Sequence, residues 1–306
     1  MRITLIHNPA AGTRRPGRDE LIATLEAHGH EVLYQSTEAG DFSHALGVPT
    51  DLVLACGGDG TVGKVACALL GRDVALAVVP QGTANNIAGF LGIDWPIEDF
   101  AVRGTDAPRR SLDIGVARGP WGVARFVEAA GLGLVAALLR GAARDHAHER
   151  IARGQTTQDT HDVEEGASRL RQAMEQMRAR PRRIEADGVD LSGDYLLVAA
   201  LNVGRIGPRV DLAPHADPGD GVLDLVLIRE EEREVLGTYL EALADGSRPE
   251  LKVPVRRVRR LLVGWPPEGG HLDDELWPRN ADGRGQEATP VSIEVVGRVE
   301  VLVAAG

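Results

Sequence analysis

The stretch LVLACGGDGT, residues 52–61, is an apolar run that ends in three glycines around one aspartate. Its apolar part is typical of a strand buried in a parallel sheet. The glycines allow a sharp turn and a close approach of backbone N–H groups to a ligand. The helix-compatible sequence that follows would add the unpaired N–H groups of a helix start. Because Asp59 lies inside this anion-binding turn, a cation is needed between its carboxylate and bound phosphates. The stretch therefore predicts nucleoside triphosphate and Mg²⁺ chemistry.

The surrounding sequence alternates between strands and helices. Strands are expected over 3–7, 31–35, 52–56 and 74–79, and helices over 19–28, 61–70 and 85–91. Such alternation predicts an α/β domain with a doubly wound parallel sheet and helices on both faces. Ligands of such sheets bind outside the carboxyl ends of the strands. We expect this nucleotide-binding domain to span residues 1–111.

Three of the expected strand ends carry turns that contain glycine. They are NPAAGT at 8–13, GGDGT at 57–61 and PQGTANN at 80–86. In a parallel sheet the three turns face the same edge, and each places a hydroxyl or amide group beside glycine. Together they predict a cleft lined with hydrogen-bond donors.

The pattern changes at about Leu112. Strands of alternating polarity are expected over 112–117, 125–130, 195–202, 223–229, 258–264 and 291–303. Proline and glycine between them predict an antiparallel, sandwich-like, β-rich domain over residues 112–290. The last strand, 291–303, follows a polar break at 280–285, and its return to the first domain is left open.

One helix is expected within this β-rich region, over residues 161–180. Its apolar residues recur at helical spacing, and they are Val163, Ala167, Leu170, Met174 and Met177. We favour packing of this helix on the β-rich domain over a position in a membrane surface.

The composition restricts the class of protein. The formal net charge of −11 argues against nonspecific binding of nucleic acid. No apolar run reaches the length of a membrane span, and the N-terminus lacks signal-peptide features, so a cytoplasmic location is the expectation. The basic run from Arg256 to Arg260 is interpreted as a solvated strand face. Cys56 and Cys67 are expected to be buried thiols.

Two motif matches are rejected at this stage. Residues 58–64 fit G-x-x-x-x-G-K, but Val65 follows where a P-loop needs a hydroxyl residue for Mg²⁺. Residues 131–136 fit the dinucleotide pattern G-x-G-x-x-A, but they lie outside the alternating region. We interpret them as close packing of a helix start on a strand.

The three turns occur in the same order in the catalytic domain of diacylglycerol kinases and their bacterial lipid-kinase relatives. The sequence therefore resembles this family, which is also similar to sphingosine and ceramide kinases and, more distantly, to NAD kinases. The likeness continues in Asn202–Gly204, Pro214–Asp224 and Leu272–Glu275, and so covers essentially the whole chain. The resemblance implies a nucleotide-binding α/β domain and a β-rich domain, with the active site in the cleft between them.

The resemblance also implies ATP and Mg²⁺ as cofactors, and a diacylglycerol-like lipid whose hydroxyl accepts the γ-phosphoryl group. The residues that it assigns to nucleotide binding are Asn8, Gly12, Gly57, Gly58, Gly60, Thr61, Gly82, Thr83 and Asn85. Asp59 would face Mg²⁺. Asp59, Asp273 and Glu275 would be catalytic, with Glu275 favoured as the general base on the lipid hydroxyl. Asp220 and Asp224 would hold a structural Mg²⁺.

Three residues depart from the family pattern. Lys64 follows Gly63 where an Asn-Glu pair is common, Asn86 stands in place of an acid, and Asp274 in place of glycine. Two alternative functions stay open: NAD kinase-like phosphorylation of NAD, and a non-catalytic nucleotide- or lipid-binding protein on the same fold.

The expected partner is a lipid substrate, met in transient peripheral contact at the inner face of the membrane. The oligomeric state is left open, with a homodimer as the commonest assembly.

Overall fold

The computed structural model describes residues 1–12, 16–141, 163–279 and 287–304. The chain divides into two units, Met1–Ile114 with Gly297–Gly306, and Gly115–Val296. Strands β5 (Arg109–Gly119) and β20 (Thr289–Leu302) each contain one of the two boundaries. The polar break expected at 280–285 lies outside the described residues.

The first unit is built on a parallel sheet with the strand order β20-β4-β3-β1-β2. Its other strands are β1 (Arg2–His7), β2 (Glu31–Ser36), β3 (Leu52–Gly57) and β4 (Ala75–Pro80). The helices between them are α1 (Arg18–Ala27), α2 (Ser43–Gly47), α3 (Asp59–Leu69), α4 (Asn86–Leu91) and α5 (Ile97–Arg103). Short 3₁₀ turns occur at Thr37–Ala39 and Gly104–Asp106.

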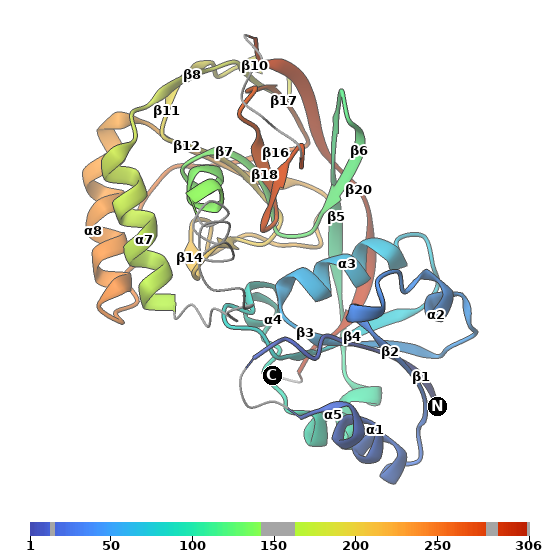
Figure 1. Cartoon of the computed structure of the whole chain (residues 1–306). Helices are drawn as coiled ribbons and strands as arrows, with labels where there is room; N and C mark the ends of the chain where they lie inside the picture. Colours follow the sequence, from blue (N-terminus) through green and yellow to red (C-terminus); the bar gives the residue numbers. More distant parts are fainter. Residues whose placement is uncertain (13–15, 142–162, 280–286, 305–306) are drawn as a thin grey trace, which may run out of the picture. The chain divides into compact units, whose positions relative to one another are not determined.

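Strand β3 runs through the centre of this unit, and all six of its residues are buried. Because successive side chains point to opposite faces of a sheet, Leu52, Leu54 and Cys56 share one face and pack in the same core as residues of α1 and α5. Helix α3 packs on the opposite face of the sheet (Figure 1). The sheet therefore has helices on both faces, as expected for a doubly wound fold. Cys56 is buried, whereas Cys67 is only partly buried, contrary to the expectation for it.

The second unit contains two antiparallel sheets. One has the order β16-β15-β12-β7-β18-β19, and the other contains β10-β9-β17-β20 together with the β5-β6 hairpin. Their strands are β6 (Gly122–Phe126), β7 (Ala129–Gly133), β9 (Ile184–Ala186), β10 (Val189–Asp190), β12 (Leu197–Leu201), β15 (Leu223–Ile228), β16 (Val255–Val258), β17 (Arg260–Trp265), β18 (Gly270–Leu272) and β19 (Glu275–Trp277). Two short pairs accompany them, β8 (Arg180–Arg182) with β11 (Gly193–Tyr195), and β13 (Arg205–Ile206) with β14 (Val210–Asp211).

The six-stranded sheet separates two cores. On β12, Val198 and Ala200 face residues of the other sheet, whereas Leu197 and Leu201 face helices. Helices α7 (Val163–Gln176) and α8 (Arg233–Ala244) lie side by side and cover this second face (Figure 1). The prediction that the 161–180 helix packs on the β-rich domain is therefore confirmed for residues 163–176, whereas residues 177–180 are not helical and Arg180 begins β8. Residues 161–162 lie outside the described residues.

Three expectations for this unit are wrong in detail. The strand expected over 125–130 is two strands, because Val127 and Glu128 interrupt it. The strand expected over 258–264 is β16 and β17, which belong to different sheets. The region was expected to contain one helix, yet residues 134–141 are also helical and α8 is a further helix, with Leu236, Tyr239, Leu240 and Leu243 buried along one side. This spacing is helical, so the signal was present in the sequence.

Candidate functional site

The loop after β3 turns directly into helix α3, which begins at Asp59 with Gly58 as its N-cap. Thr61 closes the turn, since its N–H donates to the carbonyl of Gly58 over 3.0 Å. A Cβ atom on Gly57 would lie 2.6 Å from the Thr61 hydroxyl oxygen, so only glycine fits there. The loop thus presents the first-turn N–H groups of a helix at a strand end, where an anion can bind.

Asp59 connects this loop to the next one. Its Oδ2 atom accepts a hydrogen bond from the backbone N–H of Asn86 (2.8 Å), and its Oδ1 atom accepts one from Ile87 (2.9 Å). These are the first two residues of α4. The carboxylate therefore satisfies N–H groups at the start of α4, in the manner of an N-cap supplied from another segment.

The loop after β4 approaches the β3 loop backbone to backbone. A Cβ atom on Gly82 would lie 2.6 Å from the Cα atom of Gly58. Asn85 holds this loop, because its amide accepts from the Gly82 N–H (2.8 Å) and donates to the Gly82 carbonyl (2.7 Å). Asn85 has a left-handed backbone (φ 48°), which asparagine tolerates better than most residues. Its amide group braces the loop through both of these bonds.

The turn after β1, which begins at Asn8, also lies at this edge of the sheet. The backbone N–H of Asn8 donates to the carbonyl of Cys56, and the Asn8 side chain accepts from the N–H of Ala10. Gly12 adopts a positive φ of 74° and Thr83 is exposed. The structure therefore brings Asn8, the 57–61 loop and the 82–86 loop together in one unit, and their roles toward a nucleotide stay predictions.

A Mg²⁺ ion is the metal that this loop would require. Among the described residues, no group of three or more His, Cys, Asp or Glu side chains is placed to hold a metal ion. Mg²⁺ is commonly held by one or two carboxylates together with substrate phosphates and water. One carboxylate, Asp59, at a phosphate-binding loop fits that donor set.

The two rejected motif matches have structural explanations. Lys64 is exposed on α3, and Val65, the position that a P-loop would use for Mg²⁺, is fully buried. Gly131 and Gly133 belong to strand β7, where added Cβ atoms would lie 2.6 Å from the carbonyl oxygen of Val198 on β12 and 2.1 Å from that of Leu196, just before β12. These glycines allow close packing of strand on strand.

In the second unit, Asp273 forms the turn between β18 and β19. Its carboxylate accepts hydrogen bonds from three consecutive backbone N–H groups, those of Val127 (3.0 Å), Glu128 (2.7 Å) and Ala129 (3.1 Å). Burial raises the pKa of Asp273, and the three N–H donors act against that rise. The side chain thus holds the segment between β6 and β7. The side-chain amide of Asn202 donates to the Val127 carbonyl of the same segment (2.8 Å).

Glu275 follows two residues later, at the start of β19. Its Oε2 atom accepts from both the Nε (2.9 Å) and Nη2 (2.6 Å) atoms of Arg279, whose guanidinium stacks 5.3 Å from the Trp277 ring centroid. The Glu275 side chain is 31% exposed, so a substrate is able to reach it. Asp274, which replaces a family glycine, is not among the residues with positive φ, so the substitution costs no backbone strain.

His271 lies behind this turn and was not singled out from the sequence. It is buried, and its Nδ1–H donates to the Asp273 carbonyl oxygen over 2.9 Å. Burial lowers the pKa of His271 to about 4, so the imidazole is neutral at pH 7. In the sequence, His271 is connected with the Asp273–Glu275 segment only because it directly precedes Leu272. No motif points to a role for it.

We expect His271 to make the second unit sensitive to acid. An unfolded histidine takes up a proton near pH 6.5, whereas the folded one does so near pH 4, so stability falls as the pH drops between these values. The loss from this group should reach about 3 kcal/mol at pH 4. Urea unfolding at pH 7 and at pH 4 checks this, with His271→Asn as the variant that keeps a donor toward the Asp273 carbonyl.

The raised pKa of Asp273 acts in the opposite direction over the same range, because its carboxyl group binds a proton more readily when folded. The difference between wild type and His271→Asn therefore isolates the histidine. An equal pH dependence in both proteins would contradict the prediction.

Asp220 and Asp224 lie near each other but have different surroundings. Asp220 forms an ion pair with Arg257, and its Oδ1 atom accepts from the N–H of Val222 (3.1 Å). Asp224 is buried on β15. Its pKa is raised mainly by burial, and the charges of Asp220 and Asp217 add to the rise. A guanidinium thus contacts the carboxylate that was expected to bind Mg²⁺. This arrangement does not fit a divalent ion held by both aspartates, and the ion remains a prediction without support from these contacts.

The described geometry defines an α/β unit with two glycine loops at one edge of its sheet, and an antiparallel β-rich unit, in one chain. The family Diacylglycerol kinase catalytic domain matches residues 2–117, and the family YegS C-terminal NAD kinase beta sandwich-like domain matches residues 152–303. The chain therefore belongs to the diacylglycerol kinase family of lipid kinases.

Known proteins agree with this assignment. The diacylglycerol kinase of Bacillus subtilis (strain 168) is 28% identical over 254 residues, which cover 75% of this chain and 74% of that protein. The fold is also similar to that of a diacylglycerol kinase from Bacillus anthracis str. Sterne (TM-score 0.61, 18% identity, 99% and 97% of the two chains covered). A yeast NADH kinase shares the fold at a TM-score of 0.53 and 9% identity, with 100% and 84% of the two chains covered.

Proposed function

We propose that this protein is an ATP- and Mg²⁺-dependent lipid kinase that transfers the γ-phosphoryl group to the hydroxyl of a diacylglycerol-like lipid. One observation carries the proposal: two glycine loops that meet at Gly58 and Gly82 and are joined through the carboxylate of Asp59, in a chain of the diacylglycerol kinase family. Loops of this kind bind phosphates through backbone N–H groups. Phosphoryl transfer depends mainly on positioning and on stabilisation of developing charge.

The residues then have distinct tasks. Backbone N–H groups of the Gly57–Thr61 loop hold the ATP phosphates, and Gly82, whose own N–H donates to Asn85, allows the 82–86 loop to lie against that loop. Asp59 would hold Mg²⁺ at this loop, and the ion would supply neutralisation of the charge that develops on the transferred group. Glu275 accepts the proton of the lipid hydroxyl as the new P–O bond forms, and Arg279 fixes the orientation of its carboxylate.

Asp273 is assigned a different task from the one expected of it. Its carboxylate is occupied by three backbone N–H groups, so we place it as a positioning residue that holds the hairpin on which Glu275 lies.

The lipid acceptor places the reaction at a membrane surface. No helix in the described ranges is both long and apolar enough to cross a bilayer. We therefore propose transient peripheral contact at the inner face of the membrane as the way in which the protein meets its substrate.

The experiment is a transfer assay with [γ-³²P]ATP and Mg²⁺ over extracted lipids, with NAD as a separate acceptor. Wild type should label a lipid and leave NAD unlabelled. Glu275→Gln should lower the rate by about a hundredfold, the lower end of what a general base contributes, without lowering the melting temperature. Equal rates in the two proteins would remove Glu275 as the base, and labelling of NAD alone would overturn the lipid assignment.

A further inference from the structure

The second unit contains a cavity of about 430 Å³ whose charged lining is dominated by arginine. Among the described residues, four arginines line it, and they are Arg140, Arg178, Arg180 and Arg182. Glu268 is the acidic residue of this described lining. This local excess of positive charge stands out in a chain whose net charge is −11. A cavity of this volume is large enough for a small ligand or a lipid headgroup.

Strand geometry explains how one short segment supplies most of this charge. Arg180 and Arg182 are the first and last residues of β8, so extended backbone points their side chains to the same side, and Arg178 lies two residues before the strand. Arg140 comes from a separate segment and is fixed at the wall, where its Nη1 atom donates to the carbonyls of Glu268 (3.2 Å) and Gly269 (3.4 Å).

Arg182 shows most clearly that the cavity is short of anionic acceptors. Its side chain is only 10% exposed, and among the described residues its ion-pair partner is Glu268, at an N–O distance of 3.6 Å. That distance is too long for a good hydrogen bond. Burial, opposed by Glu268, lowers the pKa of Arg182, and the charge of Arg180 adds to the lowering. A buried guanidinium with five donors is costly unless acceptors satisfy it.

Nearby carboxylates do not remove this excess. Glu230 interacts with the charge of Arg178, but its own carboxylate is already bonded to the guanidinium of Arg233. Arg233 in turn donates to the carbonyls of Met174 and Met177 at the end of α7.

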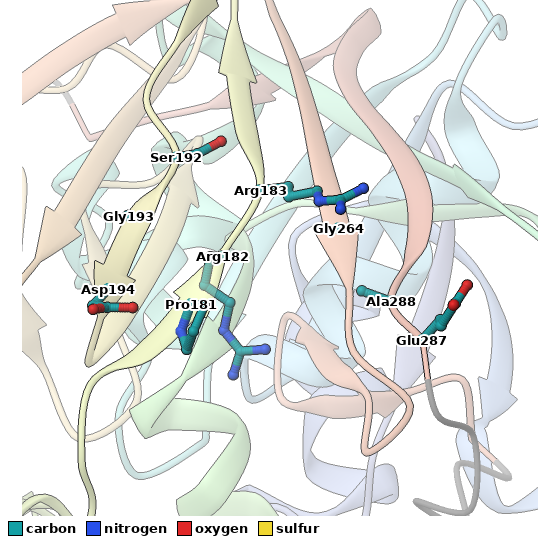
Figure 2. Close-up of a pocket in the computed structure, with 9 residues that line it drawn as sticks. All are labelled: Pro181, Arg182, Arg183, Ser192, Gly193, Asp194, Gly264, Glu287 and Ala288. Carbon is teal, nitrogen blue, oxygen red and sulfur yellow. The ribbon is translucent and has the colours of Figure 1, made fainter.

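The neighbouring cavity provides a comparison within the same unit. It has a volume of about 510 Å³ and is lined by Arg182 and Arg183 together with Asp194 and Glu287 (Figure 2). Figure 2 shows that the side chains of Arg182 and Arg183 leave the strand in different directions. Among the described residues, two arginines and two carboxylates line that cavity, so their charges balance. The positive excess is a property of the 430 Å³ cavity.

We propose that this arginine cavity binds a phosphate-bearing anion, either inorganic phosphate or the headgroup of an acidic phospholipid. Guanidinium groups match phosphate oxygens through paired, charge-assisted hydrogen bonds, and their planar shape makes the contact selective. The proposal does not depend on the proposed kinase activity, because it concerns binding in the absence of ATP and lipid acceptor.

The test compares the full-length wild type with Arg180→Gln/Arg182→Gln. The matched control is Arg256→Gln/Arg259→Gln, which removes the same charge from exposed positions outside the cavity. One arm titrates inorganic phosphate in a calorimeter. The other measures co-sedimentation with vesicles of 30% phosphatidic acid in phosphatidylcholine, with pure phosphatidylcholine vesicles as reference. Circular dichroism verifies that all three proteins are folded.

We expect the cavity variant to lose at least about tenfold in affinity in one arm, whereas the control changes by less than about twofold. A loss confined to the phosphate arm identifies free phosphate as the ligand, and a loss confined to the vesicle arm identifies the headgroup. The proposal is overturned if wild type binds in neither arm, if the cavity variant binds as wild type does, or if the control loses as much.

Discussion

Replacing Asp59 by alanine should lower phosphoryl transfer by about a thousandfold, because the substitution removes the one carboxylate of the phosphate-binding loop. Electrostatic groups placed at developing charge contribute effects of about this size in other enzymes. The same change removes the acceptor for the N–H groups of Asn86 and Ile87. We therefore also expect a loss of about 1 kcal/mol in stability from the uncapped start of α4.

Asp59→Asn separates these two effects. Asparagine keeps one oxygen that can accept an N–H bond from α4, but it has no charge to hold Mg²⁺. Transfer rates and melting temperatures of both variants provide the measurement. We expect Asp59→Asn to melt near the wild-type temperature and to be nearly as inactive as Asp59→Ala. An Asp59→Asn protein with wild-type activity would show that Asp59 only caps α4.

The sequence was most informative where burial or backbone geometry restricts which residue types fit. Strand β3 has six buried residues, and its apolar run is visible without any structure. The loops at 57–61 and 82–86 carry glycines at positions where the structure leaves no room for a Cβ atom. Backbone requirements of this kind leave a direct trace in residue identity, so the α/β unit and the meeting of its glycine loops at one sheet edge could be predicted.

The role of Asp273 could not be predicted, because its partners are backbone N–H groups about 145 residues earlier in the chain. Every residue except proline has a backbone N–H group, so such donors leave no pattern in the sequence. The split of the expected 258–264 strand between two sheets has a similar cause. The split follows from strand pairing with distant segments, because β16 pairs with β15 and β17 pairs with β20.

The arginine cavity illustrates a third limit. Arg178, Arg180 and Arg182 read as an ordinary polar segment, and the run at Arg256–Arg260 looks equally basic. Burial distinguishes Arg182 from the other arginines of both segments, since Arg178 and Arg180 are exposed as well. Arg182 is nine-tenths enclosed, whereas Arg256 and Arg259 are exposed. Enclosure depends on segments that are distant in the chain, so charge alone does not identify the site.

Asp273→Ala should destabilise the protein by about 3–5 kcal/mol. Three backbone N–H groups would lose their acceptor at once, and each unsatisfied donor costs about 1–3 kcal/mol where water cannot replace the partner. Asp273 also has a left-handed backbone (φ 51°), which alanine adopts less readily than aspartate. We expect a fall of about 10 °C in the melting temperature.

The neighbouring variant Asp274→Ala is the control, because this residue is exposed at the same turn and has an ordinary backbone. It should melt within about 2 °C of wild type, since exposed substitutions usually change stability by less than about 0.5 kcal/mol. Asp273→Asn, which keeps one acceptor oxygen, should fall between wild type and Asp273→Ala. A stable Asp273→Ala protein that has lost only its transfer activity would instead make Asp273 a catalytic residue. The segment 127–129 would then need another support, because its three N–H groups cannot remain buried without acceptors.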